Sequence, residues 1–455
     1  MIGDHRKMNQ DTIAAIATPP GTGGIGIIRM SGPEAETILN RIFCPHGTVL
    51  PLENRKLTYG HIVEEGIVLD ECMAVIMRAP GSYTREDVAE LQTHGGMRVM
   101  NTVLEVCLKY GARLAGPGEF TKRAFLNGRI DLSRAEAVMG MISARGEQEY
   151  RDAVRQMEGG TADFIRKASD ELYRLQAGLA ACIDYPEEVS DEEGTNTLKP
   201  GLEHLIKSLE EAMDEKSARL IHDGLQVTLY GTPNAGKSSL LNALLGQDKA
   251  IVTDIPGTTR DTVEGEIMID GIRVHFTDTA GLRETEDPIE KIGVERSEQA
   301  VRNADMTLLV LDGSRNMTDE ERERIQTETD RCTVLINKSD MTQITEEEDV
   351  RKINPDIVCL TVSALDADTL KPLKERLREQ TRVSDRMAIS QPRHLDAVRR
   401  AIASLKSAGK TLDTLTPDMA STDLQAAQAA LAEITGDRAD EKLLDRVFST
   451  FCVGK

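Results

Sequence analysis

The stretch LQVTLYGTPNAGKSSLLNALL, residues 225–245, decides the fold of the central part of this 455-residue chain. An apolar strand segment at 225–230 runs into the glycine loop GTPNAGKS at 231–238, and helix-forming residues follow at 239–245. This order of strand, loop and helix is the context that a Walker A phosphate-binding loop requires. The loop N–H groups can surround phosphate oxygens, and the helix N-terminus favours their negative charge. A chance glycine turn is the alternative, and the later motifs argue against it.

The end of this loop predicts specific contacts to a nucleotide. Lys237 is expected to reach the β and γ phosphates, and the Ser238 hydroxyl is expected to ligate Mg²⁺. Four neighbours are expected to contact the nucleotide as well: Asn234, Ala235, Gly236 and Ser239.

Two motifs downstream fit the metal and the γ-phosphate of such a site. GTTRD at 257–261 predicts a switch loop, in which Thr259 is the residue expected to complete the Mg²⁺ shell. DTAG at 278–281 follows an expected strand, so Asp278 can hold Mg²⁺ through water and the Gly281 N–H can meet the γ-phosphate. Thr279 and Ala280 lie between them in the same predicted contact.

Two further motifs predict recognition of guanine. NKSD at 337–340, that is Asn337, Lys338 and Asp340 around Ser339, follows an apolar strand. The Asp340 carboxylate can accept hydrogen bonds from N1–H and N2–H₂ of guanine, which adenine does not offer, and such a polar mismatch costs about 10⁴-fold. Ser363 and Ala364 follow the next strand and suit a second loop facing the base. The five motifs together predict a parallel-sheet α/β domain that binds GTP.

The residue after DTAG indicates an unusual hydrolysis mechanism. Ras-like enzymes place a glutamine there to orient the attacking water, but this chain has Leu282. Four acidic residues follow in the loop, and each alone is more often a solvated charge: Glu284, Glu286, Asp287 and Glu290. No arginine finger is evident, and a monovalent cation could supply the missing charge beside the phosphates.

Composition limits the remaining possibilities. The net charge of −21 argues weakly against direct RNA binding, which is driven by basic residues. No stretch approaches the about 18 apolar residues of a membrane helix, and the first residues lack a signal-peptide core. None of the seven cysteines forms a CxxC pair, so we expect a cytoplasmic protein without a disulfide framework.

The segments that flank the α/β part differ from it and from each other. Residues 12–120 predict a mixed α and β region, whereas 125–222 and 386–455 have helix composition. We therefore expect one helical domain with the α/β domain inserted in it. Its last part is predicted to have one apolar helix face, formed by Leu395, Val398, Ile402 and Leu405. The acidic run 184–193 is expected to be a solvated loop.

Two weaker patterns support no function by themselves. GTGGIG at 21–26 matches GxGxxG, but a strand pattern follows it where a dinucleotide site needs a helix, so a turn between strands is expected. Cys452 near the end could be a reactive thiol. A small buried residue or a frayed end is the preferred interpretation.

Several segments together resemble the MnmE family (also called TrmE) of tRNA modification GTPases, nearly from end to end. They are DTIAAIATPPG (11–21), SYTRED (82–87), HGG (94–96), PGEFT (117–121), RAFLNGR (123–129), DL (131–132), PNAGK (233–237), GTTRD (257–261) and the closing CVGK (452–455). The closing motif is the most specific, because other bacterial GTPases share the nucleotide motifs and lack it.

The resemblance implies three domains. Residues 1–124 would form an α+β domain that binds tetrahydrofolate and mediates homodimerisation. Residues 125–222 and 383–455 would form a discontinuous helical domain, and residues 223–382 would form the inserted GTPase domain. The family works with a flavoprotein, MnmG (GidA), which carries FAD, in a heterotetramer or larger assembly. Together they add an aminomethyl or carboxymethylaminomethyl group to C5 of the wobble uridine of certain tRNAs. The tRNA is held mainly by the partner, and a 5-formyl- or methylene-tetrahydrofolate supplies the carbon.

The resemblance also assigns residues. Folate contacts fall on Arg29, Glu90, Arg129 and Lys455; a carboxylate can bind the pterin N–H edge and basic groups can meet carboxylates. A K⁺ site falls on Asn234, Thr253, Ile255 through its main-chain oxygen, and Thr258, and the water-orienting carboxylate falls on Glu290. The nucleotide contacts extend over Thr253, Asp254, Ile255, Pro256, Gly257, Thr258 and Thr259. Gly140 departs from the family, which has an aspartate there.

Two other functions remain as alternatives. A regulatory GTPase that assists ribosome assembly would carry a basic RNA-binding domain such as a KH segment after the GTPase motifs, and the C-terminal region is acidic and helical instead. A stand-alone folate-dependent methyltransferase would need a substrate cavity of its own, for which the sequence gives no sign.

Overall fold

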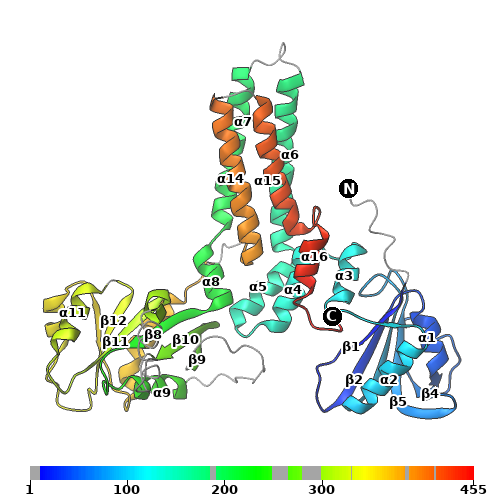
Figure 1. Ribbon diagram of the computed structural model, residues 1–455, viewed down its shortest axis with the longest axis horizontal. Helices are drawn as coiled ribbons and strands as arrows, with labels where there is room; N and C mark the ends of the chain where they lie inside the picture. Colours follow the sequence, from blue (N-terminus) through cyan, green and yellow to red (C-terminus); the bar gives the residue numbers. More distant parts are fainter. Residues whose placement is uncertain are drawn as a thin grey trace, which may run out of the picture. The chain divides into compact units, whose positions relative to one another are not determined.

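The computed structural model contains two sheets with helices beside them and a group of long helices (Figure 1). The model describes residues 11–184, 191–247, 265–278, 299–328, 330–384, 389–414 and 417–455. Contacts divide it into two units: unit 1 is Met1–Ile142, Ala153–Glu210 and Asp396–Lys455, and unit 2 is Ser143–Asp152 and Glu211–Leu395. The predicted combination of an α+β region, a discontinuous helical region and an inserted α/β region is confirmed.

A seven-stranded sheet forms the first part of unit 1, in the order β3-β4-β5-β6-β2-β1-β7. Its strands are β1 (Ile13–Ile16), β2 (Gly23–Ser31), β3 (Phe43–Pro45), β4 (Thr58–Glu64), β5 (Ile67–Met77), β6 (Val88–Gly95) and β7 (Arg113–Leu114). All neighbours are antiparallel except β1 and β7. Because β2 begins at Gly23, within the GxGxxG match, a strand and not a helix follows the turn after β1, and the expected turn between strands is confirmed.

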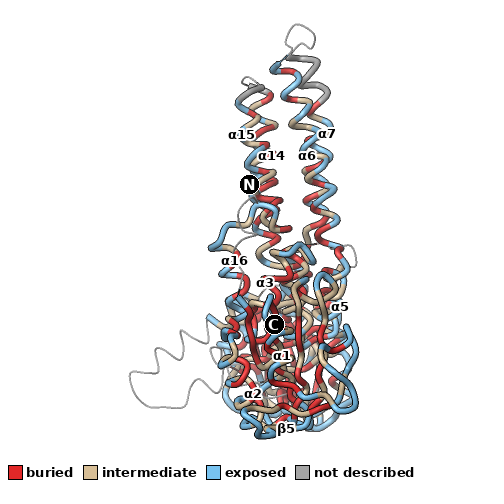
Figure 2. Tube along the Cα trace, turned by 90° about the vertical axis from the view of Figure 1, so that its right-hand side faces the viewer, coloured by how far each residue is buried: buried red, intermediate tan, exposed pale blue. Residues whose placement is uncertain are grey.

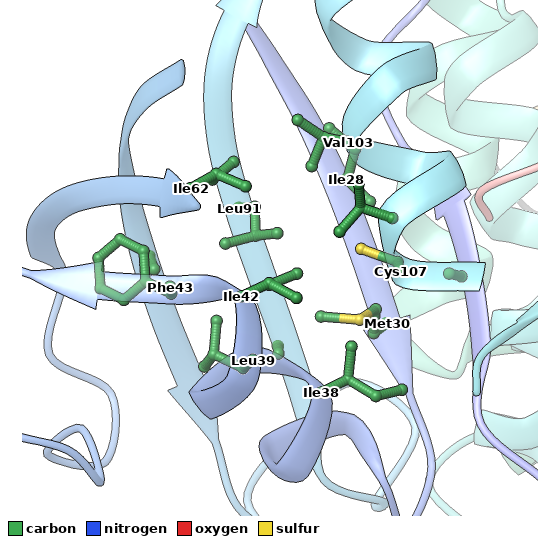
Figure 3. Close-up of a cluster of buried hydrophobic side chains, with 14 of the residues drawn as sticks. Ile28, Met30, Ile38, Leu39, Ile42, Phe43, Ile62, Leu91, Val103 and Cys107 are labelled. Carbon is green, nitrogen blue, oxygen red and sulfur yellow. The ribbon is translucent and has the colours of Figure 1, made fainter. Parts of the chain in front are cut away.

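One face of this sheet is covered by α1 (Ala35–Ile42) and α2 (Met97–Lys109). Alternate strand residues such as Ile28, Met30 and Leu91 point toward these helices and form the core (Figure 3). Since side chains alternate along a strand, Arg29 and Glu90 lie on the opposite face, where a smaller buried cluster includes Ile13, Ala15 and Phe120.

The helices of unit 1 come from segments far apart in the sequence. They are α3 (Glu119–Leu126), α4 (Leu132–Ser143), α5 (Glu147–Glu158), α6 (Gly160–Asp184), α7 (Asp191–Ala212), α14 (Pro392–Thr414), α15 (Pro417–Thr435) and α16 (Glu441–Phe448). The bounds of unit 2 include the first half of α5 and the ends of α4, α7 and α14. Helices α6 and α15 pack side by side, and Lys406 of α14 pairs with Glu210 of α7 (2.7 Å). Buried residues recur along all four long helices (Figure 2). The predicted apolar face of α14 is confirmed, since Val398 and Leu405 are fully buried.

Two details of these helices concern the sequence predictions, namely the acidic run 184–193 and the unusual Gly140. Helix α7 begins at Asp191, so the end of the acidic run 184–193 is helical where a loop was expected. Gly140 lies in α4, and a Cβ added to it would be 3.1 Å from the Cβ of Ala153 in α5. A larger side chain at this position would therefore crowd the contact between the two helices.

The C-terminal segment is bonded into unit 1. Val453 bridges Pro117, and the N–H groups of Gly118 and Phe120 donate to the oxygens of Cys452 (3.3 Å) and Lys455 (3.1 Å). The preferred interpretation of Cys452 is therefore wrong: its side chain is exposed, not buried, and the end is held by backbone bonds instead of frayed.

A six-stranded sheet forms the centre of unit 2, in the order β13-β12-β11-β8-β10-β9. The strands are β8 (Leu225–Tyr230), β9 (Gly265–Ile269), β10 (Ile272–Asp278), β11 (Met306–Asp312), β12 (Cys332–Asn337) and β13 (Val358–Thr361). Five strands are parallel, as predicted; β9 is antiparallel to β10 because the two-residue turn Asp270–Gly271 joins them. The helices are α8 (Glu215–Asp223), α9 (Lys237–Gln247), α11 (Asp319–Thr327), α12 (Glu347–Ile353) and α13 (Lys371–Gln380).

None of the helices in the described ranges combines the length and apolar character that crossing a bilayer requires.

Candidate functional site

The glycine loop between β8 and α9 has a backbone that only certain residues tolerate. Gly231 has φ 142° and Gly236 has φ 94°, and Asn234 is left-handed as well with φ 62°. A Cβ on Gly231 would lie 2.3 Å from the main-chain oxygen of Val310 in the neighbouring strand β11. The loop therefore turns sharply at the carboxyl end of β8, where ligands bind to open parallel sheets.

Lys237 and Ser238 lie where the loop becomes helix α9. The Lys237 ammonium donates to the main-chain oxygens of Gly231 (3.1 Å) and Thr232 (3.0 Å), so it points back over the loop. The Ser238 hydroxyl donates to Oδ2 of Asp278 (2.9 Å), which ends β10 and is buried. The structure thus brings together two oxygen groups predicted around Mg²⁺, and oxygen ligands are those that Mg²⁺ prefers.

The two loops predicted to face guanine converge next to this loop. The Asn337 amide donates to the main-chain oxygen of Ala235 (2.9 Å). The hydroxyl of Ser363 donates to Oδ1 of Asp340 (2.5 Å), which joins the loop after β12 to the loop after β13. Oδ1 of Asn337 is buried and has no partner among the described residues, so it remains for a ligand or water. This fits a base pocket with donors and acceptors still to be filled.

Lys338 is held by an ion pair at the end of β11. Its backbone is left-handed (φ 68°) and its ammonium lies 2.6 Å from Oδ2 of Asp312. Burial opposes ionisation of Asp312, but the hydrogen bonds from Lys338 and Ser314 outweigh burial and lower its pKa. Asp312 therefore stays charged and fixes Lys338 beside the loop after β12.

A cluster beside the glycine loop was not predicted from the sequence. The Thr232 hydroxyl donates to Oε1 of Glu321 (2.8 Å) and accepts from Nη2 of Arg315 (3.0 Å). Arg315 also bonds both carboxylate oxygens of Glu321, at 2.7 and 3.0 Å. The only local signal was the capping box Thr318-x-x-Glu321 that begins α11. The cluster anchors the first turn of the glycine loop to that helix.

Part of the predicted site falls outside the described residues. This applies to Thr253, Asp254, Ile255, Pro256, Gly257, Thr258, Thr259, Thr279, Ala280, Gly281, Leu282 and Glu290, and to the acidic candidates Glu284, Glu286 and Asp287.

The predicted folate residues gather at the face of the first sheet opposite α1 and α2 and at the adjoining C-terminal segment. Arg29 and Glu90 are directly opposite on β2 and β6, and Nε of Arg29 donates to Oε1 of Glu90 (2.8 Å). The guanidinium of Arg29 is 5.8 Å from the ring of Phe120, whose N–H bonds the oxygen of Lys455.

Tyr83 connects the fourth predicted residue to this group. The guanidinium of Arg129 lies 4.5 Å from the centre of the Tyr83 ring, and that of Arg29 lies 6.0 Å from it. The Tyr83 hydroxyl also bonds the Thr121 hydroxyl (3.0 Å). Tyr83 was not singled out from the sequence, although it lies in the quoted motif SYTRED.

Two family models match the chain. The model described as the N-terminus of GTP-binding protein TrmE matches residues 12–129, and the MnmE helical domain model matches residues 132–452.

Full-length relatives were also found. A tRNA modification GTPase MnmE from Alkaliphilus oremlandii is 40% identical, covering 98% of this chain and 99% of that protein. One of the same name from Listeria innocua is 41% identical and covers 98% and 100%. Among solved structures, the G domain of the T. maritima FeoB iron transporter is 26% identical over 35% of this chain and 99% of that chain, with a TM-score of 0.27.

Proposed function

The chain belongs to the MnmE family of tRNA modification GTPases, and we propose that it couples K⁺-dependent GTP hydrolysis to modification of the wobble uridine of certain tRNAs. One observation carries the nucleotide part of the proposal. The glycine loop, the Ser238–Asp278 pair and the joined loops of Asp340 and Ser363 meet at the carboxyl end of one largely parallel sheet. A nucleotide bound there would find phosphate contacts at one end and guanine contacts at the other.

The residues of the nucleotide site have separate tasks in this proposal. The N–H groups of 234–239 bind phosphate oxygens, and Lys237 leaves the loop oxygens to neutralise phosphate charge. Ser238 and Thr259 would hold Mg²⁺, and Asp278 would help to hold it through water; the ion would supply positive charge that offsets the charge of the phosphates. The Asp340 carboxylate accepts hydrogen bonds from N1–H and N2–H₂ of guanine, and the Ser363 hydroxyl keeps this carboxylate in place.

Hydrolysis needs a water-orienting group and an additional charge, since Leu282 cannot replace a glutamine. We assign orientation of the water to Glu290 and binding of K⁺ to Asn234, Thr253, Ile255 and Thr258. The position of Asn234 in the glycine loop supports its part, because the residue is exposed and can reach a ligand there. K⁺ in this position would supply positive charge where an arginine finger acts in other GTPases.

The N-terminal part is assigned to the one-carbon chemistry. Glu90 would bind the pterin N–H edge of a 5-formyl- or methylene-tetrahydrofolate, and Arg29, Arg129 and Lys455 would hold its other polar groups. The gathering of these four residues around Tyr83 and Phe120 supports this assignment. The division into domains at 124, 222 and 382 belongs to the same proposal.

The proposal includes partners. The chain would act in the cytoplasm as a homodimer, with the flavoprotein MnmG (GidA) supplying FAD in a heterotetramer or larger complex and holding most of the tRNA. The net charge of −21 supports this, because a partner would have to provide most contacts to RNA.

Nucleoside analysis of tRNA from a strain lacking this gene tests the function. We expect the C5 substituent of wobble uridine to disappear and to return when the chain is supplied again. An unchanged nucleoside profile, especially with altered ribosome assembly, would instead favour the regulatory GTPase alternative.

A further inference from the structure

An open cavity of about 710 Å³ lies along β5 in unit 1. Its apolar wall includes Val75, Met77 and Tyr83. Three arginines line it as well: Arg55, Arg85 and Arg129. No carboxylate from the described residues lines it, although the whole chain has a net charge of −21. A cavity with this lining attracts an anion that also has apolar parts.

These three arginines contact main-chain oxygens and an aromatic ring. Nε of Arg55 donates to the Gly81 oxygen (3.1 Å), Nη1 of Arg85 donates to the Asn127 oxygen (3.0 Å), and Arg129 lies over Tyr83. Within the described ranges none of the three pairs with a carboxylate. An arginine has five donor hydrogens in a fork that matches carboxylates, so each retains donors for a ligand.

The backbone at two of these arginines has an uncommon conformation. In the described part of the chain, six non-glycine residues have positive φ: Arg55, Glu65, Arg85, Asn234, Asp270 and Lys338. Glu65 and Asp270 precede glycines in hairpin turns, where the conformation is ordinary. Asn234 and Lys338 belong to the nucleotide motifs. Arg55 (φ 62°) and Arg85 (φ 61°) are thus the remaining pair, and such backbone strain clusters at ligand sites.

The cavity continues the surface of the proposed folate site. Glu90 lies opposite Arg29 on one side and opposite Val75 on the other, so the three side chains form one row across β2, β6 and β5. Arg129 belongs both to the cavity lining and to the Tyr83 contacts of the folate site. A ligand whose ring system binds at Glu90 would have its tail near Arg55 and Arg85.

We propose that this cavity binds the oligo-γ-glutamate tail of the folate, so that Arg55 and Arg85 select polyglutamylated over monoglutamylated forms. The proposal rests on the proposed folate function. A γ-glutamyl chain carries one carboxylate per unit between methylene groups, which matches arginines alternating with apolar side chains. The continuity with Glu90 favours this small amphipathic ligand over an RNA backbone.

Calorimetry on the full chain tests the selection. The probes are 5-formyl-tetrahydrofolate with one and with five glutamates. We expect the wild type to prefer the pentaglutamate by about tenfold, since two or three exposed charge-assisted contacts add up to that order. Arg55→Gln/Arg85→Gln should reduce the preference to about twofold or less. The affinity for the monoglutamate should be nearly unchanged, because its single glutamate makes few contacts to these arginines and one exposed charge contact changes affinity only modestly.

A charge-matched control separates the cavity from general electrostatics. Lys56→Gln/Arg98→Gln removes two exposed cations that do not line the cavity, and it should retain the preference. Equal affinity of the wild type for both folates, or an undiminished preference in the arginine variant, overturns the proposal.

Two further measurements distinguish its failure from failure of the folate assignment. If the wild type binds neither folate, the folate assignment fails, and penta-γ-glutamate without a pterin is then the probe for the cavity. Binding of this peptide that is lost in Arg55→Gln/Arg85→Gln supports the γ-glutamate proposal. No binding of the peptide to the wild type overturns the proposal. If the arginine variant instead weakens only tRNA binding, the cavity recognises phosphate and the γ-glutamate proposal is overturned.

Discussion

The side-chain amide of Asn337 donates a hydrogen bond to the main-chain oxygen of Ala235 over 2.9 Å, and both groups are buried. Asn337 is the last residue of β12, and Ala235 lies in the glycine loop after β8, two strands away in the sheet. The predicted guanine loop and the phosphate loop are therefore one connected unit. A change at either loop should affect binding of both ends of the nucleotide.

Asn337→Ala should weaken binding of GTP and GDP alike. It leaves the Ala235 oxygen without its donor, and an unsatisfied buried group costs about 1–3 kcal/mol, or about tenfold or more in affinity. Titration with a fluorescent nucleotide measures this. The exposed Asn316→Ala serves as a matched control; equal affinities in both variants would show that the bond does not organise the site.

Thr232→Val should speed nucleotide dissociation. Valine has the shape of threonine without the hydroxyl, so Arg315 and Glu321 lose a shared partner and the glycine loop loses its anchor, at a cost of about 1–3 kcal/mol. Thr232→Ser retains the hydroxyl and should behave nearly like the wild type. Stopped-flow displacement gives the rates, and a valine variant with a normal off-rate would reduce the cluster to a purely structural role.

Glu321 should make the stability of unit 2 depend on acid pH. Burial opposes its ionisation, but hydrogen bonds from Arg315, the Thr318 N–H and Thr232 outweigh burial and lower its pKa below the usual value of a glutamate. A carboxylate whose pKa is lower in the folded than in the unfolded state stabilises the fold fully at pH values above its unfolded pKa. This stabilisation is lost as the pH falls through the folded pKa. Urea unfolding at several pH values below about 5 should thus show a flatter pH dependence for Glu321→Gln than for the wild type. Identical slopes would contradict this account.

Replacing Na⁺ with K⁺ in the buffer should raise GTP turnover. The proposed cation site at Asn234 replaces a missing arginine, and removing one such charge from a transition state costs about 10²-fold or more. Phosphate release at constant ionic strength is the measurement, with nucleotide affinity as the control for a binding effect. Equal rates in the two salts would remove the cation from the mechanism.

Gly454→Ala should release the C-terminal segment from β1. Gly454 has φ 97°, and an added Cβ would lie 2.4 Å from the main-chain oxygen of Ile16. Hydrogen exchange of the Phe120 amide, which bonds the Lys455 oxygen, should accelerate. Gly111→Ala, also at positive φ but with open space around its Cβ, controls for backbone strain alone; equal exchange in both variants would contradict the steric explanation.

The nucleotide motifs could be predicted because each is local. A glycine loop between strand and helix fixes its own geometry, and parallel strands then place Ser238, Asp278 and Asp340 at one edge. The apolar periodicity of α14 predicted its buried face for the same reason, since it depends only on residues within a few turns.

The missed features depend on residues far apart in sequence. Thr232 meets Glu321 across 89 positions, and Tyr83 lies between Arg29 and Arg129. No periodicity reports such contacts. The exposure of Cys452 was misjudged because a chain end has no pattern of its own, and its backbone partners at 118 and 120 come from another segment.

The exposed thiol of Cys452 is also a site for attaching a fluorescent label. Of the seven cysteines only Cys44 and Cys452 are exposed. Burial raises the pKa of the Cys72, Cys107 and Cys359 thiols to about 12 and that of Cys332 to about 11, which keeps them unreactive toward maleimides. After Cys44→Ser, a single dye would report by its emission whether the closing segment moves when nucleotide is added.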